Sequence, residues 1–239
     1  MTVDDKTLAR MAQKLRRHSL EMTSEAASGH PTTCMSCAEI VSVLFFDEMR
    51  FNPKDPSGRD QDVFVLSKGH AAPILWAALK EAGAISLDLL TLRRYDSPLE
   101  GHPTSQSPWV RVATGSLGQG LAAAAGMAWA RKLDGSEARV YALLGDGEAA
   151  EGSVFEAAQY ASFNKLKNLC AILDVNRLGQ SGPTMYQHDV GVYADRFLAF
   201  GWNVAVVDGH VVPELRDAFA RARATGDKPS VVVARTLKG

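Results

Sequence analysis

Apolar and polar positions alternate along the chain in a way that predicts helices and strands in turn. Leu8, Met11, Ala12 and Leu15 recur at helical spacing, and a second helical stripe follows in residues 40–45. Short apolar runs typical of buried strands lie at 63–66, 140–144, 169–175, 204–207 and 231–233. Helical sequence at 71–82, at 154–163 and after Pro213 separates these runs. The pattern predicts an α/β fold, with a parallel sheet covered by helices on both faces.

The length of the chain, 239 residues, is enough for one large core, because a chain of this size can bury roughly 70–75% of its unfolded surface. No internal repeat or linker interrupts the pattern, so we expect residues 1–239 to form a single domain. Residues 52–61 are rich in Pro, Asp and Gly and predict a surface loop.

Charge and cysteine content narrow the class of protein. A formal net charge of −1 gives no electrostatic reason to expect binding to nucleic acid or to a membrane surface. Three cysteines do not make a disulfide framework and suit a reducing compartment. The N-terminus has no apolar signal region, and no apolar stretch approaches the ~20 residues that span a bilayer. We therefore expect a soluble cytoplasmic protein.

Two polar residues follow predicted strands in the middle of the chain. Asp146 comes directly after the strand that stops at Gly145, and Asn176 follows the strand at 169–175. If these strands are neighbours, both side chains face one crevice at the carboxyl ends of the sheet, where open α/β sheets bind ligands. A carboxylate and an amide oxygen are suited to Mg²⁺ or Ca²⁺, and such a site usually also holds a phosphate-bearing cofactor.

Glycine and histidine motifs mark several turns. The glycine-rich segment 114–120 precedes a predicted long helix; it could approach an anion, or it could simply be a tight turn. The segment Ser67-Lys68-Gly69-His70 follows a strand directly, so His70 is expected to enter a helix at the same edge of the sheet; the alternative is a capping serine with solvated neighbours. Gly29 can end the first helix, with His30 extended before Pro31, and residues 101–103 repeat this Gly-His-Pro construction in a loop.

Together these motifs resemble the N-terminal, diphosphate-binding domain of transketolase, a thiamine diphosphate enzyme, and especially its animal-type branch. The resemblance extends over nearly all 239 residues. It is carried by residues 29–32, 66–75, 101–103, 113–120, 144–148, 151–153 and 174–181. The spacing from Asp146-Gly147 to Asn176 marks thiamine diphosphate enzymes in general, and the three histidine motifs narrow the resemblance to transketolase-like members.

The resemblance implies a metal and cofactor site. Asp146, the side chain of Asn176 and the backbone carbonyl of Leu178 would hold Mg²⁺ or Ca²⁺ against the diphosphate of thiamine diphosphate. The residues that match cofactor contacts are His70, Gly115, Ser116, Leu117, Gly147, Asn176, Gln180 and Lys238. The resemblance places Gln180 near the thiazolium and aminopyrimidine rings.

The same resemblance implies catalytic and substrate residues. His30, His70 and His102 match histidines around the hydroxyl groups of the substrate, where imidazoles can move protons. Thr33 stands where animal members carry serine; its hydroxyl remains, but its additional methyl could narrow the choice of donor. Glu151 and Glu156 match acids that link cofactor sites across a dimer, although charges on a helix surface are the plain alternative.

The implied activity is ketol transfer, in which a two-carbon glycolaldehyde unit passes from a ketose phosphate to an aldose phosphate. Transketolases continue into pyrimidine-binding and C-terminal domains, which are absent from this chain. The sequence is therefore interpreted as the N-terminal subunit of a split transketolase, active only with a C-terminal-half partner. Oligomerisation around a dimer is expected as well, and the small-residue segment Ala122–Ala128 is a candidate surface for close packing.

Other interpretations stay open at this stage. The chain could belong to another thiamine diphosphate enzyme, such as a dihydroxyacetone synthase or a deoxyxylulose phosphate synthase. It could be a catalytically incomplete cofactor-binding or scaffold subunit, or a nucleotide-binding α/β protein. The pair Cys34 and Cys37, one helical turn apart, could be redox-active, but no thioredoxin-like pattern surrounds it.

Overall fold

Five parallel strands form the central sheet, in the order β1-β2-β3-β5-β4. They are β1 (Val63–Leu66), β2 (Val140–Gly145), β3 (Leu169–Val175), β4 (Asn203–Asp208) and β5 (Ser230–Arg235). The computed structural model describes residues 3–238. Strands β2 and β3 are buried along their whole length, as their continuous apolar runs predict.

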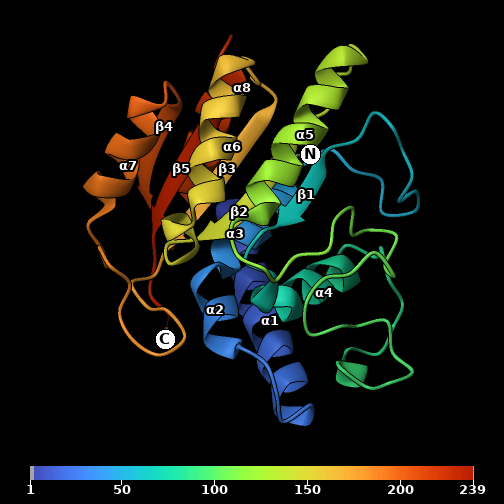
Figure 1. The fold of residues 1–239 in the computed structure, drawn as a ribbon. Helices are drawn as coiled ribbons and strands as arrows, with labels where there is room; N and C mark the ends of the chain where they lie inside the picture. Colours follow the sequence, from blue (N-terminus) through green and yellow to red (C-terminus); the bar gives the residue numbers. More distant parts are fainter. Residues whose placement is uncertain (1–2, 239) are drawn as a thin grey trace.

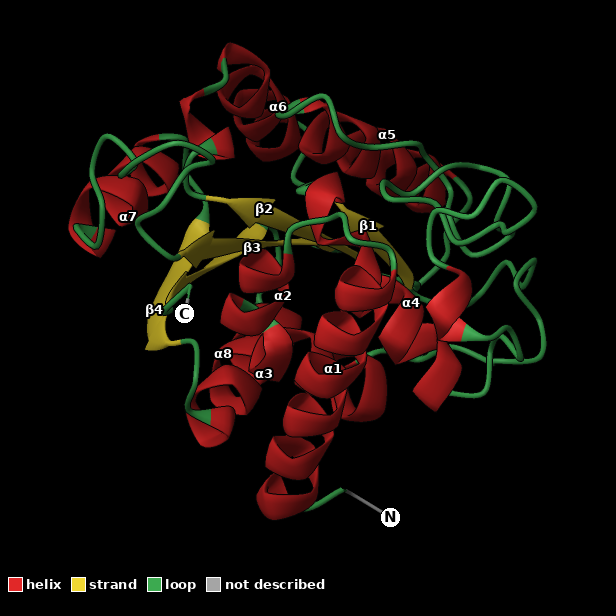
Figure 2. Ribbon diagram, turned by 90° about the horizontal axis from the view of Figure 1, so that it is seen from below, coloured by secondary structure: helices red, strands yellow, loops and turns green. Residues whose placement is uncertain are grey.

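Helices cover both faces of the sheet, as Figures 1 and 2 show. One layer consists of α1 (Asp5–Glu25), α2 (Pro31–Ser36), α3 (Ala38–Val43), α4 (Ala72–Glu81) and α8 (Val212–Ala224). The opposite layer consists of α5 (Gln119–Leu133), α6 (Gly152–Phe163) and α7 (Val190–Ala199). The predicted α/β architecture is confirmed.

The core is divided by the sheet into two clusters, because successive strand residues point to opposite faces. Leu143 and Ile172 belong to the cluster under α1, whereas Leu144 and Leu173 belong to the cluster under α5. Small residues of α5 and α6, such as Ala125 and Ala158, are buried in the second cluster.

Some predicted boundaries differ from the structure. The first helix, α1, begins after its N-cap Asp4, whose Oδ1 accepts a hydrogen bond from the Thr7 amide at 2.7 Å. It ends at Glu25, four residues before Gly29, which was expected to end it. Two residues after the helix take a positive φ, Ala27 at +45° and Gly29 at +125°. His70 does not enter an α-helix directly but lies in a 3-10 turn, Gly69–Ala71, before α4.

The pattern also predicts no helix between β3 and β4, although α7 lies there. Its buried stripe consists of only Tyr193, Ala194 and Phe197, which is too short to stand out in the sequence. Shorter turns complete the chain, namely a π-helical turn at Leu44–Glu48 and 3-10 turns at Leu89–Thr91 and Glu148–Ala150. Within residues 3–238, no helix combines the length and apolar character needed to cross a bilayer.

Candidate active site

A cavity of about 290 Å³ lies where the carboxyl ends of β1, β2 and β3 meet the loops that follow them. The chain reaches it from segments far apart in sequence, beginning with the turn before α2 and ending with the residues after β5. Its lining consists of His30, Thr33, Lys68, His70, His102, Gly115, Leu117, Gly145, Asp146, Gly147, Glu148, Asn176, Leu178, Gly179, Gln180 and Lys238. Most of the residues singled out in the sequence therefore meet at one place.

Asp146 lies at the end of β2, where three donors hold its buried carboxylate. Its Oδ1 accepts a hydrogen bond from the Gly147 amide at 3.0 Å. Its Oδ2 accepts from the Arg177 amide at 2.8 Å and from the Thr184 hydroxyl at 2.9 Å. Burial raises the pKa of Asp146; the hydrogen bond from Thr184 opposes this rise and the Asp174 carboxylate adds to it. A bound cation would stabilise the ionised form of such a carboxyl.

Asn176 follows β3 and lines the same cavity as Asp146. The expectation that the two strands are neighbours is confirmed, because Gly145 pairs with Asp174 across β2 and β3. The Asn176 Nδ2 donates to Asp174 Oδ2 at 3.0 Å, and its Oδ1 accepts from the Leu178 amide at 3.2 Å.

Oxygen atoms of different kinds could hold a divalent cation here. Within residues 3–238, no group of three or more His, Cys, Asp or Glu side chains is placed to hold a metal ion. The cavity instead offers the carboxylate of Asp146, the amide of Asn176 and the backbone carbonyl of Leu178, whereas the second carboxylate in its lining, Glu148, already accepts three hydrogen bonds. This donor set is too small to enclose a cation alone but fits Mg²⁺, which usually keeps waters and shares its remaining positions with substrate or cofactor phosphates.

Lys238 brings a positive charge to the same edge of the cavity. Its Nζ donates to the carbonyl oxygens of Leu178 at 2.8 Å and Gly179 at 3.1 Å. Burial lowers the pKa of Lys238, and the ammonium group of Lys68 lowers it further. The residues after β5 thus supply a cation that could face a diphosphate.

Three histidines, His30, His70 and His102, also line the cavity. The rings of His30 and His70 pack edge to face, with their centroids 5.6 Å apart. Burial, and then the positive charge of Lys68, lower the pKa of His70 to about 3. Burial also lowers the pKa of His102, and His30 and Arg93 add to this effect. His70 is therefore a neutral imidazole at neutral pH, with one donor nitrogen and one acceptor nitrogen.

The glycine-rich turn before α5 is held by a buried carboxylate, that of Glu148. Its Oε1 accepts from the Ser67 hydroxyl at 2.5 Å and from the Gly118 amide at 2.9 Å, and its Oε2 accepts from the Gly145 amide at 3.1 Å. Gly118 takes φ +88°, a conformation that favours glycine, directly before the helix begins. The Ser67 side chain therefore connects the end of β1 to the turn after β2 rather than capping a helix.

Three of the predicted residues lie outside the cavity lining. Ser116 is an exposed neighbour of two lining residues, Gly115 and Leu117. Glu151 and Glu156 are exposed at the beginning of α6.

Sequence reasoning missed the buried charges under the cavity. Lys68 was expected to be solvated, but Lys68 and Asp174 form an ion pair in which both side chains have no solvent exposure. Burial alone would lower the pKa of Lys68, but the Asp174 carboxylate raises it above its ordinary value. Lys68 and hydrogen bonds from neighbouring groups keep the pKa of Asp174 below its ordinary value in spite of burial. A charge inside an apolar strand, such as Asp174 in residues 169–175, is the signal that could have revealed the pair.

The two cysteines of the Cys-x-x-Cys pair are buried and lack the environment of reactive thiols. Burial raises the pKa of Cys34 to about 11 and that of Cys37 to about 12. Their sulfhydryls donate to backbone carbonyls, such as that of Thr33. A redox role requires accessible thiolates, so the geometry does not support one.

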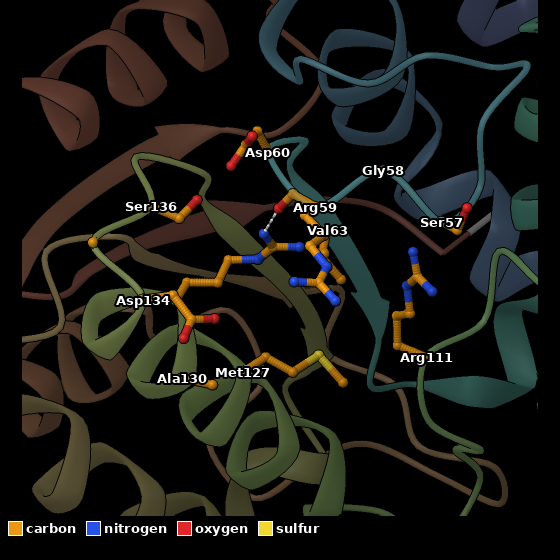
Figure 3. A pocket seen from close by; sticks show the side chains of 12 residues that line it. Ser57, Gly58, Arg59, Asp60, Val63, Arg111, Met127, Ala130, Asp134 and Ser136 are labelled. Atoms are coloured by element: carbon orange, nitrogen blue, oxygen red, sulfur yellow. Dashed lines mark hydrogen bonds between the residues drawn. The ribbon is translucent and has the colours of Figure 1, made fainter.

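A larger cavity, of about 910 Å³, lies elsewhere, next to β1 and the second half of α5. Figure 3 shows the residues around it, including Arg59, Asp60, Arg111 and Asp134. Its lining contains none of the catalytic, cofactor, metal or substrate residues predicted from the sequence. We therefore take the smaller cavity at the strand ends as the candidate active site.

Comparison with known proteins shows which family the chain matches. Residues 7–239 match the family described as "Transketolase, thiamine diphosphate binding domain". The chain is 53% identical to human transketolase over 95% of its own length and 36% of that protein, and 55% identical to Bos taurus transketolase-like protein 2 over 96% and 37%. It is 39% identical to one subunit of the apulose-4-phosphate transketolase of Phocaeicola vulgatus, over 98% of its own length and 83% of that bacterial protein.

A solved structure leads to the same conclusion. Campylobacter jejuni transketolase superposes with a TM-score of 0.89 at 34% identity, covering 98% of this chain and 38% of that one. The chain thus spans little more than a third of the animal transketolases that it matches and most of the bacterial subunit. The fold, the family match and these similarities show that the chain belongs to the transketolase family, as a thiamine diphosphate-binding domain.

Proposed function

We propose that this chain is the cofactor-binding subunit of a transketolase that moves a two-carbon ketol unit from a ketose phosphate to an aldose phosphate. The observation that carries the proposal is the convergence of Asp146 and Asn176 with His30, His70 and His102 around one cavity. A cation site next to a set of imidazoles suits a diphosphate cofactor and a polyhydroxylated substrate.

In this proposal the metal is Mg²⁺, with Ca²⁺ as the alternative, and its protein ligands are Asp146, the Asn176 amide oxygen and the Leu178 carbonyl. The cofactor is contacted by His70, Gly115, Ser116, Leu117, Gly147, Asn176, Gln180 and Lys238. Thiamine diphosphate, when bound, supplies the electron sink for cleavage of a carbon–carbon bond next to a carbonyl. The Lys238 ammonium and the amide of Gly147 would face the negative diphosphate.

The histidines do the work of proton transfer on the substrate side. A neutral imidazole can take a proton from a substrate hydroxyl or donate one to it, and the lowered pKa values of His70 and His102 keep the neutral form in place. His30 and Thr33 complete the wall that faces the sugar. Glu151 and Glu156 are assigned to contacts between subunits.

We also propose that residues 1–239 form one domain that acts together with a separate chain carrying the pyrimidine-binding and C-terminal domains. The support is the difference in coverage, since the chain spans 36% of human transketolase but 83% of a relative that is named as one subunit of a transketolase. The complex would be a hetero-oligomer built on a dimer, with the exposed small residues of α5 and the exposed Phe163 of α6 as its packing surface. Three free, buried cysteines suit a reducing, cytoplasmic location.

Reconstitution of ketol transfer tests this function. The purified chain is assayed with xylulose 5-phosphate and an aldose phosphate, alone and with a C-terminal-half transketolase subunit, in the presence of Mg²⁺ and thiamine diphosphate. We expect activity only in the mixture, and a loss of at least about 100-fold in His30→Ala. His18→Ala serves as the matched control, because His18 lies on α1 and contacts Glu81, away from the cavity. Turnover by the chain alone, or full activity of His30→Ala, would contradict the proposal.

A further inference from the structure

The buried Lys68 ammonium is connected to the candidate active site through a single hydroxyl group. Its Nζ pairs with Asp174 and donates to both the carbonyl and the hydroxyl oxygen of Thr33, each at 3.1 Å. All three N–H groups of the ammonium are thereby used inside the protein.

This arrangement determines the direction of the Thr33 hydroxyl. An ammonium group can only donate, so the Thr33 Oγ1 must accept from Lys68. The remaining partner of Oγ1 among the described residues is His70 Nε2, at 3.2 Å. The hydroxyl proton therefore points to Nε2. If Nε2 carried a proton of its own, a hydroxyl that is 1% exposed would be left without an acceptor, which is unfavourable.

The direction of that hydroxyl in turn determines which tautomer of His70 is present. A neutral imidazole has one protonated nitrogen, and the hydrogen bond made by the other nitrogen selects it. With Nε2 accepting from Thr33, the proton lies on Nδ1, and Nδ1–H is the donor that His70 offers to the cavity. We propose that Lys68, anchored by Asp174, is a positioning residue that holds His70 in the Nδ1–H tautomer through the hydroxyl of Thr33.

A buried ion pair can also be purely structural, because its charges stabilise one another without affecting neighbouring groups. The two roles differ in one observable, the protonated nitrogen of His70. Only one part of the proposal rests on the proposed function, namely that the oriented imidazole acts on the substrate. The tautomer is measured on the chain without cofactor, so this test and the reconstitution assay fail independently.

The test is two-bond ¹⁵N–¹H correlation spectroscopy of the ¹⁵N-histidine-labelled chain near pH 7, with the His70 signals identified by their loss in His70→Gln. We expect the Nδ1–H form to exceed the Nε2–H form by roughly tenfold, which corresponds to about 1.4 kcal/mol. In Lys68→Met, and in Thr33→Val, which removes the hydroxyl at nearly constant volume, we expect this excess to disappear.

Ser36→Ala is the matched control. Its hydroxyl donates to the same Asp174 oxygen as Lys68 but makes no hydrogen bond to His70, so the tautomer should not change. If Lys68→Met does not fold, Thr33→Val decides. An Nε2–H tautomer in the unaltered chain, or an Nδ1–H tautomer that survives in Thr33→Val, would overturn the proposal.

Discussion

The amide of Asn176 donates from Nδ2 to the carboxylate of Asp174 at 3.0 Å, two residues back along the same strand end. This contact determines the orientation of the Asn176 amide, since only its nitrogen can donate to an ionised carboxylate. The amide oxygen accepts from the Leu178 backbone and would face the cation of the proposed function. A buried ion pair thus orients a predicted metal ligand.

Replacement of this amide by a carboxylate tests the contact. In Asn176→Asp the donor is lost and a second negative charge lies against Asp174, so we expect the free energy of unfolding to fall by about 1–3 kcal/mol in urea denaturation. Added Mg²⁺ should recover part of this loss. Asn52→Asp is the control, because Asn52 is exposed and uses only its side-chain oxygen, as an acceptor from the Lys54 amide. Equal stability of both variants would argue against the orienting contact.

Gly115 is expected to tolerate no side chain. It takes φ +148°, and a Cβ there would lie 2.9 Å from Cδ2 of the His102 ring. Gly115→Ala should displace His102 and lower both stability and ketol transfer in the reconstituted enzyme. Gly226→Ala is the matched control, since Gly226 is exposed, its φ is not positive and nothing lies within 4 Å of the added Cβ, so stability should change by less than about 0.5 kcal/mol. Similar losses in both variants would show that Gly115 has no special environment.

The buried histidine makes stability depend on pH. The pKa of His70 falls from 6.5 to about 3 on folding, so between these values the unfolded chain binds a proton that the folded chain does not. Stability should therefore fall as the pH falls from about 6.5 towards 3. Between pH 7 and 5, the free energy of unfolding should drop by up to about 2 kcal/mol more in the unaltered chain than in His70→Gln. Identical pH profiles of the two proteins would contradict the buried neutral imidazole.

The carboxylate of Glu148 should be needed for stability even though it carries no assigned chemistry. Glu148→Ala leaves the Ser67 hydroxyl and the amides of Gly118 and Gly145 without their acceptor. We expect a loss of about 3 kcal/mol in denaturant unfolding, because each buried donor left unsatisfied is costly. Glu137→Ala, at an exposed glutamate, should change stability by less than about 0.5 kcal/mol. A small change in the free energy of unfolding of Glu148→Ala would mean that these loops do not need the Glu148 carboxylate for their stability.

The fold was largely predictable because apolar runs such as 140–144 and 169–175 have the period and length of buried parallel strands. Helix α7 escaped prediction because its buried face contains only three residues. The end of α1 was misplaced because Ala27, which is not a glycine, already takes a positive φ two residues before Gly29 does. Hydrophobic periodicity indicates which positions of an element are buried, but it does not indicate the backbone conformation of the turn at which the element ends.

For the candidate site, the sequence predicted the residues that follow strands but not those that support them. Asp146 and Asn176 stand out because a polar residue ends an apolar run. Asp174 stands out as a charge within an apolar run, but its partner Lys68 can be identified only when β1 and β3 are brought together across β2. Pairings between distant segments depend on the tertiary structure, which no local pattern contains.

Binding calorimetry with Mg²⁺ and thiamine diphosphate tests most directly whether Asp146 and Asn176 hold a cation against a diphosphate. It is carried out on the chain alone and with a C-terminal-half subunit, and NAD is the competing ligand. We expect saturable binding that requires Mg²⁺, is lost in Asp146→Ala and is retained in the exposed control Asp227→Ala, with no heat from NAD. Binding that survives in Asp146→Ala, or that occurs only with NAD, would contradict the account.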